Sequence, residues 1–164
     1  MPNDTNKAAN NVTPISHSKN TTSNTEILEK VIDVYENLGK NSLDGLTTLY
    51  TKDVYFEDPA HAIQGISALT DYFEKLFDNV ENCQFRFHNS LCQGDKLFLC
   101  WTMTLQHKSL KGGQKIFVEG ASLLKVRHHQ VYYHRDYFDL GSMLYENLPI
   151  LGSLIRRIKK GLSS

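Results

Sequence analysis

The chain has 164 residues, and its 18 basic and 18 acidic side chains give a formal net charge of zero at neutral pH. That balance gives no electrostatic support to a general nucleic-acid-binding role. No apolar run approaches the roughly 18 residues of a membrane span, and the N-terminus lacks an apolar leader, so we expect one cytoplasmic domain.

Residues 1–24 are rich in Asn, Thr and Ser and nearly free of apolar side chains, which predicts a disordered tail. Ser23 and Glu26 then have the spacing of a capping box, and apolar residues from Ile27 to Leu38 fall on one helical stripe. The elements expected next are a helix at 43–50, a strand at 54–58, a loop at 61–65 and a helix at 66–79.

The hydrophobic period then changes from 3.6 to 2, beginning with the alternation of Cys83, Phe85 and Phe87 with polar residues. Further strands are expected near 96–107, 116–127 and 131–139. Helices followed by an antiparallel run of strands predict an α+β fold. A curved antiparallel sheet wrapped on three N-terminal helices would enclose a pocket between the two layers.

Residues 142–164 form an amphipathic basic extension, in which Pro149 is placed to open an additional C-terminal helix. Its apolar stripe faces away from a basic side made of Arg156, Arg157, Lys159 and Lys160. Two interpretations remain open. The stripe of residues 149–162 packs on the sheet or on a second subunit, or it contacts an anionic membrane surface.

The last strand carries the clearest chemical pattern. On a regular strand one face holds an imidazole and a carboxylate within an aromatic wall, formed by Tyr132, His134, Asp136 and Phe138. Such a pair can act as acid and base on one small molecule, or it can be a buried polar pair satisfied by its neighbours. Trp101 either forms the floor of the pocket or is an ordinary residue of the hydrophobic core. The histidines show no metal-ligand spacing, so neither a metal nor a cofactor is expected.

Three segments together resemble the nuclear transport factor 2-like superfamily, which includes ketosteroid isomerases, limonene epoxide hydrolases and SnoaL-like polyketide cyclases. They are VIDVYENLGKNSLDGLTTLYTKDVYFEDP, IQGISALTDYFEKLF and VYYHRDYFDLGSMLY. The resemblance covers roughly residues 26–145. It implies a cone-shaped fold with a SnoaL-like domain at 25–141, and a homodimer.

The resemblance to ketosteroid isomerases implies that Asp58 in YFEDP is a general base and that Tyr35 is a hydroxyl donor. Their second donor, a protonated carboxyl, falls near Ser122 in this chain, so two of the three roles match. From the residues alone, Asp58 before a proline can instead organise a loop, and Tyr35 can be a core tyrosine.

The resemblance of RDYFDL to the final strand of limonene epoxide hydrolases implies a catalytic Asp136, with Tyr55 and Glu57 in the partner positions. The charged pair on the middle strand of those enzymes is replaced by Trp101 and Met103, so epoxide hydrolysis is not expected. Successive side chains of a strand point to opposite faces, so Asp58 cannot face the pocket together with Tyr55 and Glu57. We expect Asp58 to face the pocket, because an inward Glu57 has no evident partner.

Two functions follow as expectations. The first is acid–base chemistry, such as isomerisation, cyclisation or dehydration, on a hydrophobic carbonyl compound. The second is non-catalytic ligand binding or protein interaction on the same fold. The expected catalytic residues are Asp58, Asp136, His134 and Tyr35, and the expected pocket residues are Trp101, Tyr55, Ser122, Tyr132 and Phe138.

Overall fold

The structure is a computed structural model that describes residues 21–39 and 42–162. The predicted tail lies outside the described residues as far as residue 20, while residues 21–24 already belong to the first helix, α1 (Thr21–Glu36). Ser23 therefore lies inside the helix rather than before it, and its side chain is outside the described set.

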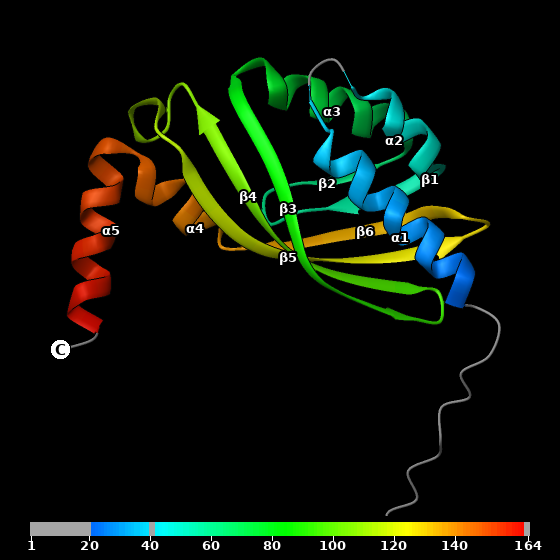
Figure 1. The fold of residues 1–164 in the computed structure, drawn as a ribbon. Helices are drawn as coiled ribbons and strands as arrows, with labels where there is room; N and C mark the ends of the chain where they lie inside the picture. Colours follow the sequence, from blue (N-terminus) through cyan, green and yellow to red (C-terminus); the bar gives the residue numbers. More distant parts are fainter. Residues whose placement is uncertain (1–20, 40–41, 163–164) are drawn as a thin grey trace, which may run out of the picture.

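Six strands form one curved sheet in the order β2-β1-β6-β5-β4-β3 (Figure 1). They are β1 (Tyr50–Glu57), β2 (Ala62–Gln64), β3 (Val80–Gln93), β4 (Lys96–His107), β5 (Ile116–Arg127) and β6 (Gln130–Phe138). Neighbouring strands are antiparallel except β1 and β6, which pair in parallel. The last strand of the sequence thus lies between β1 and β5, near the middle of the sheet.

Helices α1, α2 (Asp44–Leu49) and α3 (Ile66–Asp78) cover one side of the sheet and bury the core against it (Figure 1). In α3 the buried positions Leu69, Phe73 and Phe77 recur every fourth residue, as expected for one helical face. In β4 every second residue from Leu97 to Leu105 is buried, which is the strand counterpart of that pattern. The predicted α+β architecture is confirmed.

Two local predictions differ from the structure. The short second helix ends at Leu49, because Tyr50 adopts an extended backbone with φ −100° and ψ 151° and begins β1. The stretch expected to be a loop contains β2, which pairs with Tyr55–Glu57 of β1. Gly65, with φ 88° and ψ 150°, then supplies the positive-φ conformation from which α3 starts.

After β6 the chain forms α4 (Leu140–Met143), a short 3-10 turn η2 (Tyr145–Asn147) and the helix α5 (Pro149–Leu162). Asp139 caps α4 by accepting a hydrogen bond from the Ser142 amide at 2.9 Å. Helix α5 lies beyond one end of the sheet (Figure 1) and contacts η2. No helix among the described residues is both long enough and apolar enough to cross a membrane.

The outer face of the sheet carries exposed apolar side chains, namely Leu91, Phe98, Phe117 and Tyr137. They come from four adjacent strands, so they share the surface that the helices do not cover. Such a surface is compatible with the homodimer expected from the sequence, which stays a prediction.

Candidate functional site

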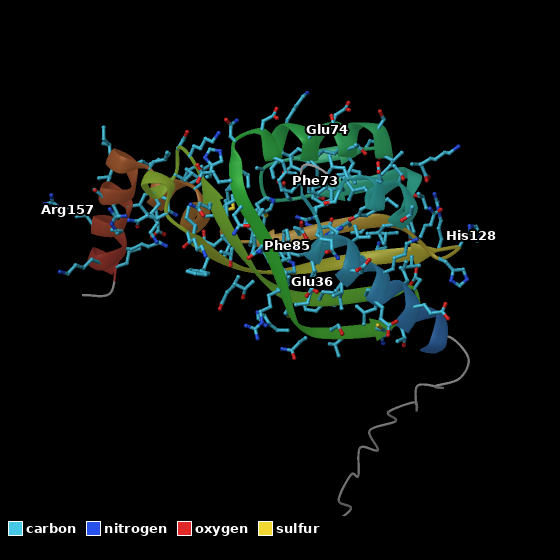
Figure 2. All side chains as sticks on the ribbon, turned by 45° about the horizontal axis from the view of Figure 1, so that its top comes forward. Glu36, Phe73, Glu74, Phe85, His128 and Arg157 are labelled. Carbon is cyan, nitrogen blue, oxygen red and sulfur yellow. The ribbon has the colours of Figure 1, made fainter. Side chains whose placement is uncertain are left out.

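A cavity of about 400 Å³ lies between helices α1 and α3 and the concave face of the sheet. Its wall is mostly apolar and aromatic, with contributions from Phe56, Trp101 and Phe138. Phe73 of α3 and Phe85 of β3 also line it, and both are labelled in Figure 2. The short helix α4 adds Leu140 and Met143, so the cavity wall extends past residue 141. Its volume falls in the range of pockets that hold one small molecule.

A β-bulge sets the direction of the side chains on β6. Val131 pairs with Val126 and Tyr133 pairs with Lys125, which leaves Tyr132 as an extra residue without a partner on β5. The bulge lets both Val131 and His134 face the core, although three positions separate them. Normal alternation then carries Asp136 and Phe138 to the cavity side.

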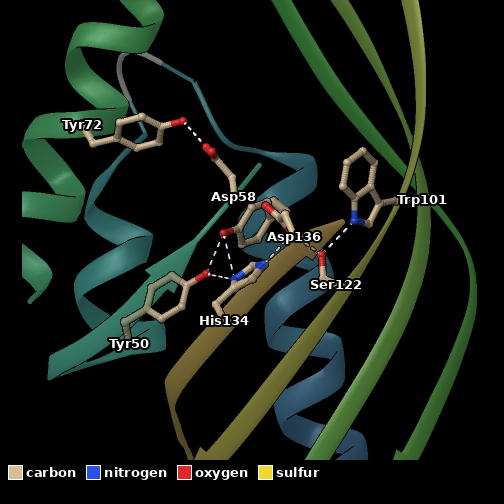
Figure 3. Close-up of polar contacts among 8 residues, drawn as sticks. Tyr50, Asp58, Tyr72, Trp101, Ser122, His134 and Asp136 are labelled. Atoms are coloured by element: carbon tan, nitrogen blue, oxygen red, sulfur yellow. Dashed lines mark hydrogen bonds and ion pairs between the residues drawn. The ribbon is translucent and has the colours of Figure 1, made fainter. Parts of the chain in front are cut away.

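A chain of hydrogen bonds crosses the back of the cavity (Figure 3). Trp101 Nε1 donates to Ser122 Oγ at 2.8 Å, and Ser122 Oγ donates to Asp136 Oδ1 at 2.5 Å. The same Asp136 Oδ1 lies 2.8 Å from His134 Nε2. On the other side of the imidazole, Nδ1 lies 2.5 Å from Tyr50 Oη, and Tyr50 Oη lies 2.6 Å from Tyr35 Oη.

The indole fixes the direction of these bonds, because its N–H can only donate. Ser122 therefore accepts from Trp101 and directs its own proton to Asp136. A neutral His134 with its proton on Nε2 donates a hydrogen bond to the Asp136 carboxylate and accepts one from the Tyr50 hydroxyl at Nδ1. With this arrangement, every link of the chain has one donor and one acceptor.

Burial keeps the two tyrosines protonated. It is the largest cause that raises the pKa of Tyr35 well above its usual value, and the nearby Tyr50 and Asp136 raise it further. Burial likewise raises the pKa of the Tyr50 hydroxyl, although the hydrogen bond from Tyr35 acts in the opposite direction. Both phenols thus remain hydrogen-bond donors around neutral pH.

His134 and Asp136 differ in access to the cavity. His134 is 2% exposed and lies behind the cavity wall, whereas the Asp136 side chain is 13% exposed and lines the cavity. The hydrogen bonds of Asp136 to described residues fall on Oδ1. The carboxylate is therefore held through one oxygen by two protein donors, at the boundary between a buried network and an apolar chamber.

Asp58 lies at the cavity wall but outside this network. Its Oδ1 accepts the backbone amides of Ala60 and His61 at 2.6 and 2.7 Å, and its Oδ2 accepts the hydroxyl of Tyr72 at 2.7 Å (Figure 3). Burial, followed by the bond to Asp58, raises the pKa of Tyr72 well above its usual value. This is the loop-organising geometry that the sequence left open beside a general-base role.

The other predicted residues divide into two groups. Tyr35, Trp101 and Phe138 line the cavity with Asp58 and Asp136, whereas Ser122 and His134 line a void of about 10 Å³ directly behind it.

Tyr55 and Tyr132 do not belong to the lining of either space. On the outer side of β1, the Tyr55 ring stacks on that of Tyr133, with 5.8 Å between the ring centroids, beside the Glu57–Arg135 ion pair. Tyr132 is the bulge residue, and its ring lies against the guanidinium of Arg127. For these two residues the expected pocket position is wrong. For Tyr132 the reason is the bulge, which breaks the regular alternation. For Tyr55 the reason is that Phe56, rather than its neighbour, is buried on the concave side.

Tyr50 is the network member that the sequence did not identify as a site residue. It is 1% exposed and begins β1, while its partner His134 lies 84 positions later in the chain. No spacing rule links these positions, because the parallel pairing of β1 with β6 brings them together. In residues 21–39 and 42–162, no group of three or more His, Cys, Asp or Glu side chains is placed to hold a metal ion.

Comparison with known proteins agrees with this architecture. Among solved structures, a protein from Jannaschia sp. CCS1 assigned as a SnoaL-like polyketide cyclase superposes with a TM-score of 0.66 at 20% identity, covering 79% of this chain and 94% of that one. A protein with a ketosteroid isomerase-like fold from Catenulispora acidiphila, in complex with trimethylamine, gives 0.65 at 21% identity, covering 76% and 94%.

A nuclear transport factor 2-like protein from Burkholderia pseudomallei K96243 gives a TM-score of 0.66 at 11% identity, covering 74% of this chain and 95% of that one. At these identities the similarities establish the fold alone. A search of curated proteins finds no match. Residues 31–134 match the SnoaL-like domain family. The chain therefore belongs to the SnoaL-like domain family.

Proposed function

We propose that this protein binds a small hydrophobic carbonyl compound in its cavity and transfers a proton on it through Asp136. The observation that carries the proposal is the position of the Asp136 carboxylate, which accepts from both arms of a buried hydrogen-bond chain and lines the cavity. The similarity to a protein assigned as a polyketide cyclase is consistent with a carbonyl substrate.

In the proposed step, Asp136 Oδ2 takes a proton from a carbon next to the carbonyl group. The electron pair of the broken C–H bond moves into the carbonyl to form an enolate. Return of the proton to a second atom of the same molecule completes an isomerisation without net consumption of protons. Ser122 and His134 hold Oδ1 throughout, so that Oδ2 is presented to the substrate in one orientation.

His134 also supports the change of charge on Asp136. Its Nε2–H stabilises the carboxylate before the transfer, and its ring is kept in that tautomer by the hydroxyl of Tyr50 at Nδ1. Tyr35 contacts both Nδ1, at 3.3 Å, and the cavity. A ligand that packs against the Tyr35 ring therefore contacts the same hydrogen-bond network that orients Asp136.

One observation favours a second candidate function, which is ligand binding without turnover. Asp58, the other carboxylate at the cavity, already accepts three hydrogen bonds from its own loop and from Tyr72. The site thus offers one carboxylate for chemistry rather than the two separate groups expected from the sequence. A cavity with one acidic group can also serve to orient a ligand.

A single experiment separates the two candidates. Hydrophobic ketones are screened for binding through the fluorescence of Trp101, the one tryptophan of the chain, and then incubated with the protein in deuterium oxide. Exchange of ligand C–H for deuterium in the wild type, and its loss in Asp136→Asn with binding retained, supports proton transfer. Binding without exchange in the wild type identifies a binding protein.

Asp58→Asn serves as the matched control, because the substitution is also carboxylate to amide at the cavity wall. We expect it to retain exchange. Loss of exchange in Asp58→Asn together with full exchange in Asp136→Asn overturns the assignment of the base.

A further inference from the structure

We propose that helix α5 is an interfacial anchor that binds the surface of an anionic membrane, with its apolar stripe turned toward the lipid. The proposal does not depend on the proposed function of the cavity. It rests on how α5 is attached to the rest of the protein, because its polar side faces inward and its apolar side faces outward.

The inward side of α5 is polar. Arg156 Nη1 donates to the backbone carbonyl of Glu146 at 2.8 Å, and Lys159 forms an ion pair with the Glu146 carboxylate. Gly152 is buried against the same carbonyl, where a β-carbon would overlap the oxygen. Positions 152, 156 and 159 fall on one helical face, so this face is attached to η2 through Glu146.

The outward side of α5 is apolar and exposed. The exposed fractions are 88% for Ile150, 39% for Leu151, 55% for Leu154, 56% for Ile158 and 82% for Leu162. These residues form one continuous stripe on the helix, and in the described structure they are turned to solvent rather than to the sheet. In the described structure the stripe does not pack on the sheet, so a second subunit and a membrane surface are the interpretations of the sequence that stay open. An apolar stripe presented in this way indicates a binding surface.

The charges around the stripe favour an anionic surface over a second copy of the chain. Helix α5 contains four basic residues and no acidic residue, so the pairing of two such helices would bring like charges together. A helix of 14 residues is also only about 21 Å long, which is short for the roughly 800 Å² per partner of a stable protein interface. Anionic headgroups instead attract these basic side chains.

Arg157 shows how the apolar stripe and the basic charge of α5 lie next to each other. Figure 2 shows Arg157 on the side of α5 that is turned away from the sheet. It follows Leu154 by three positions and precedes Ile158 by one, so it borders the apolar stripe. A side chain there can reach phosphate groups while the neighbouring leucine and isoleucine enter the boundary between headgroups and acyl chains.

The attachment also relates the anchor to the cavity. Met143 and Leu144 line the cavity, and the chain runs from them through η2 directly into α5. A protein held by α5 would therefore keep this end of its apolar chamber close to the lipid surface.

The test uses the full-length chain in flotation with vesicles of phosphatidylcholine alone and of phosphatidylcholine and phosphatidylglycerol in equal parts. We expect binding to the anionic vesicles that weakens with salt, and little binding to the neutral ones. The double variant Leu154→Ser/Ile158→Ser should weaken the binding about tenfold or more. Arg157→Gln should weaken it about fivefold.

The matched control is Leu91→Ser/Phe117→Ser, which removes exposed apolar side chains from the outer face of the sheet. It should bind like the wild type, and circular dichroism checks that all variants are folded. Absence of wild-type binding to anionic vesicles overturns the proposal, as does equal binding by the α5 variant. So does a wild-type dimer that dissociates in Leu154→Ser/Ile158→Ser and does not float with vesicles, because that result identifies a second copy as the occupant.

Discussion

Gly120 on β5 lies directly beneath the indole ring of Trp101, its cross-strand partner on β4. A β-carbon at position 120 would overlap three carbons of the six-membered ring. The missing side chain therefore lets the large indole lie flat across the neighbouring strand, from where its Nε1 reaches Ser122 two residues further along β5.

Gly120→Ala should displace the indole and weaken the Trp101–Ser122 bond. Overfilling a packed site typically lowers the free energy of unfolding by about 1–3 kcal/mol, and we expect a loss in that range. Urea denaturation measures the loss, and a shift in the emission of the single tryptophan shows that its surroundings changed. Ala121→Ser, on the adjacent residue of β5, should leave both signals unchanged, and an unperturbed Gly120→Ala would contradict the close packing.

Ser122→Ala should destabilise the fold because it leaves the indole N–H without its acceptor and Asp136 without one of its two donors. Leaving a buried polar group unpaired costs about 1–3 kcal/mol, so the free energy of unfolding should fall by that amount. Ser90→Ala, at an exposed position of β3, is the control. Equal stability of the two variants would show that the serine bond contributes nothing to the fold.

Asp58→Ala should be less stable than Asp58→Asn. The amide retains an oxygen that can accept the Ala60 and His61 amides, whereas alanine leaves both of them and the Tyr72 hydroxyl without a partner. We expect a difference of about 1–2 kcal/mol in the free energy of unfolding, measured by thermal or urea denaturation. Identical melting temperatures for the two variants would mean that the loop does not depend on this acceptor.

The protein should lose stability at alkaline pH. Unfolded tyrosines lose their protons near pH 10, whereas burial raises the pKa of Tyr35 and Tyr50 in the fold. Their contribution is therefore complete below about pH 10. Above it the unfolded state binds fewer protons, so the free energy of unfolding falls by about 1.4 kcal/mol per pH unit for each tyrosine.

Urea midpoints measured from pH 8 to 11 check this prediction. Tyr50→Phe should show a shallower decline than the wild type, since one of the titrating groups is absent. Tyr137→Phe, which removes a hydroxyl from an exposed ring, should follow the wild-type slope. Parallel declines in the wild type and Tyr50→Phe would show that the buried phenol does not couple to unfolding.

Elements with a long, regular pattern could be predicted from the sequence. The expected bounds of β4 and β5 coincide with the structure, because each strand has one face on the core and repeats it over twelve residues. The first half of β1 was not predicted. Residues 50–53 follow a helix without a glycine or proline between them, and only Tyr50 in this stretch is buried. The three residues of β2 are too few for periodicity to appear.

The site was predictable where its members share one strand. His134 and Asp136 are two positions apart on β6, so alternation alone brought them together. The same rule placed Tyr132 with them, and there it failed, because a bulge is a property of the pairing with β5 rather than of the local sequence. The link from Tyr50 to His134 depends on sheet order, which no local pattern contains.

The central place of β6 has a consequence for how the protein is made. Its two flanking strands are β1, synthesised early, and β5, synthesised just before it, so the two halves of the sheet join only when the last strand enters between them. A nascent chain that has emerged only to residue 129 has neither His134 nor Asp136 and lacks the contact that closes the sheet. Because closure depends on pairings between residues about 80 positions apart, we expect it to be the slow step of folding. The chamber and its carboxylate thus form together, when β6 pairs with both of its neighbours.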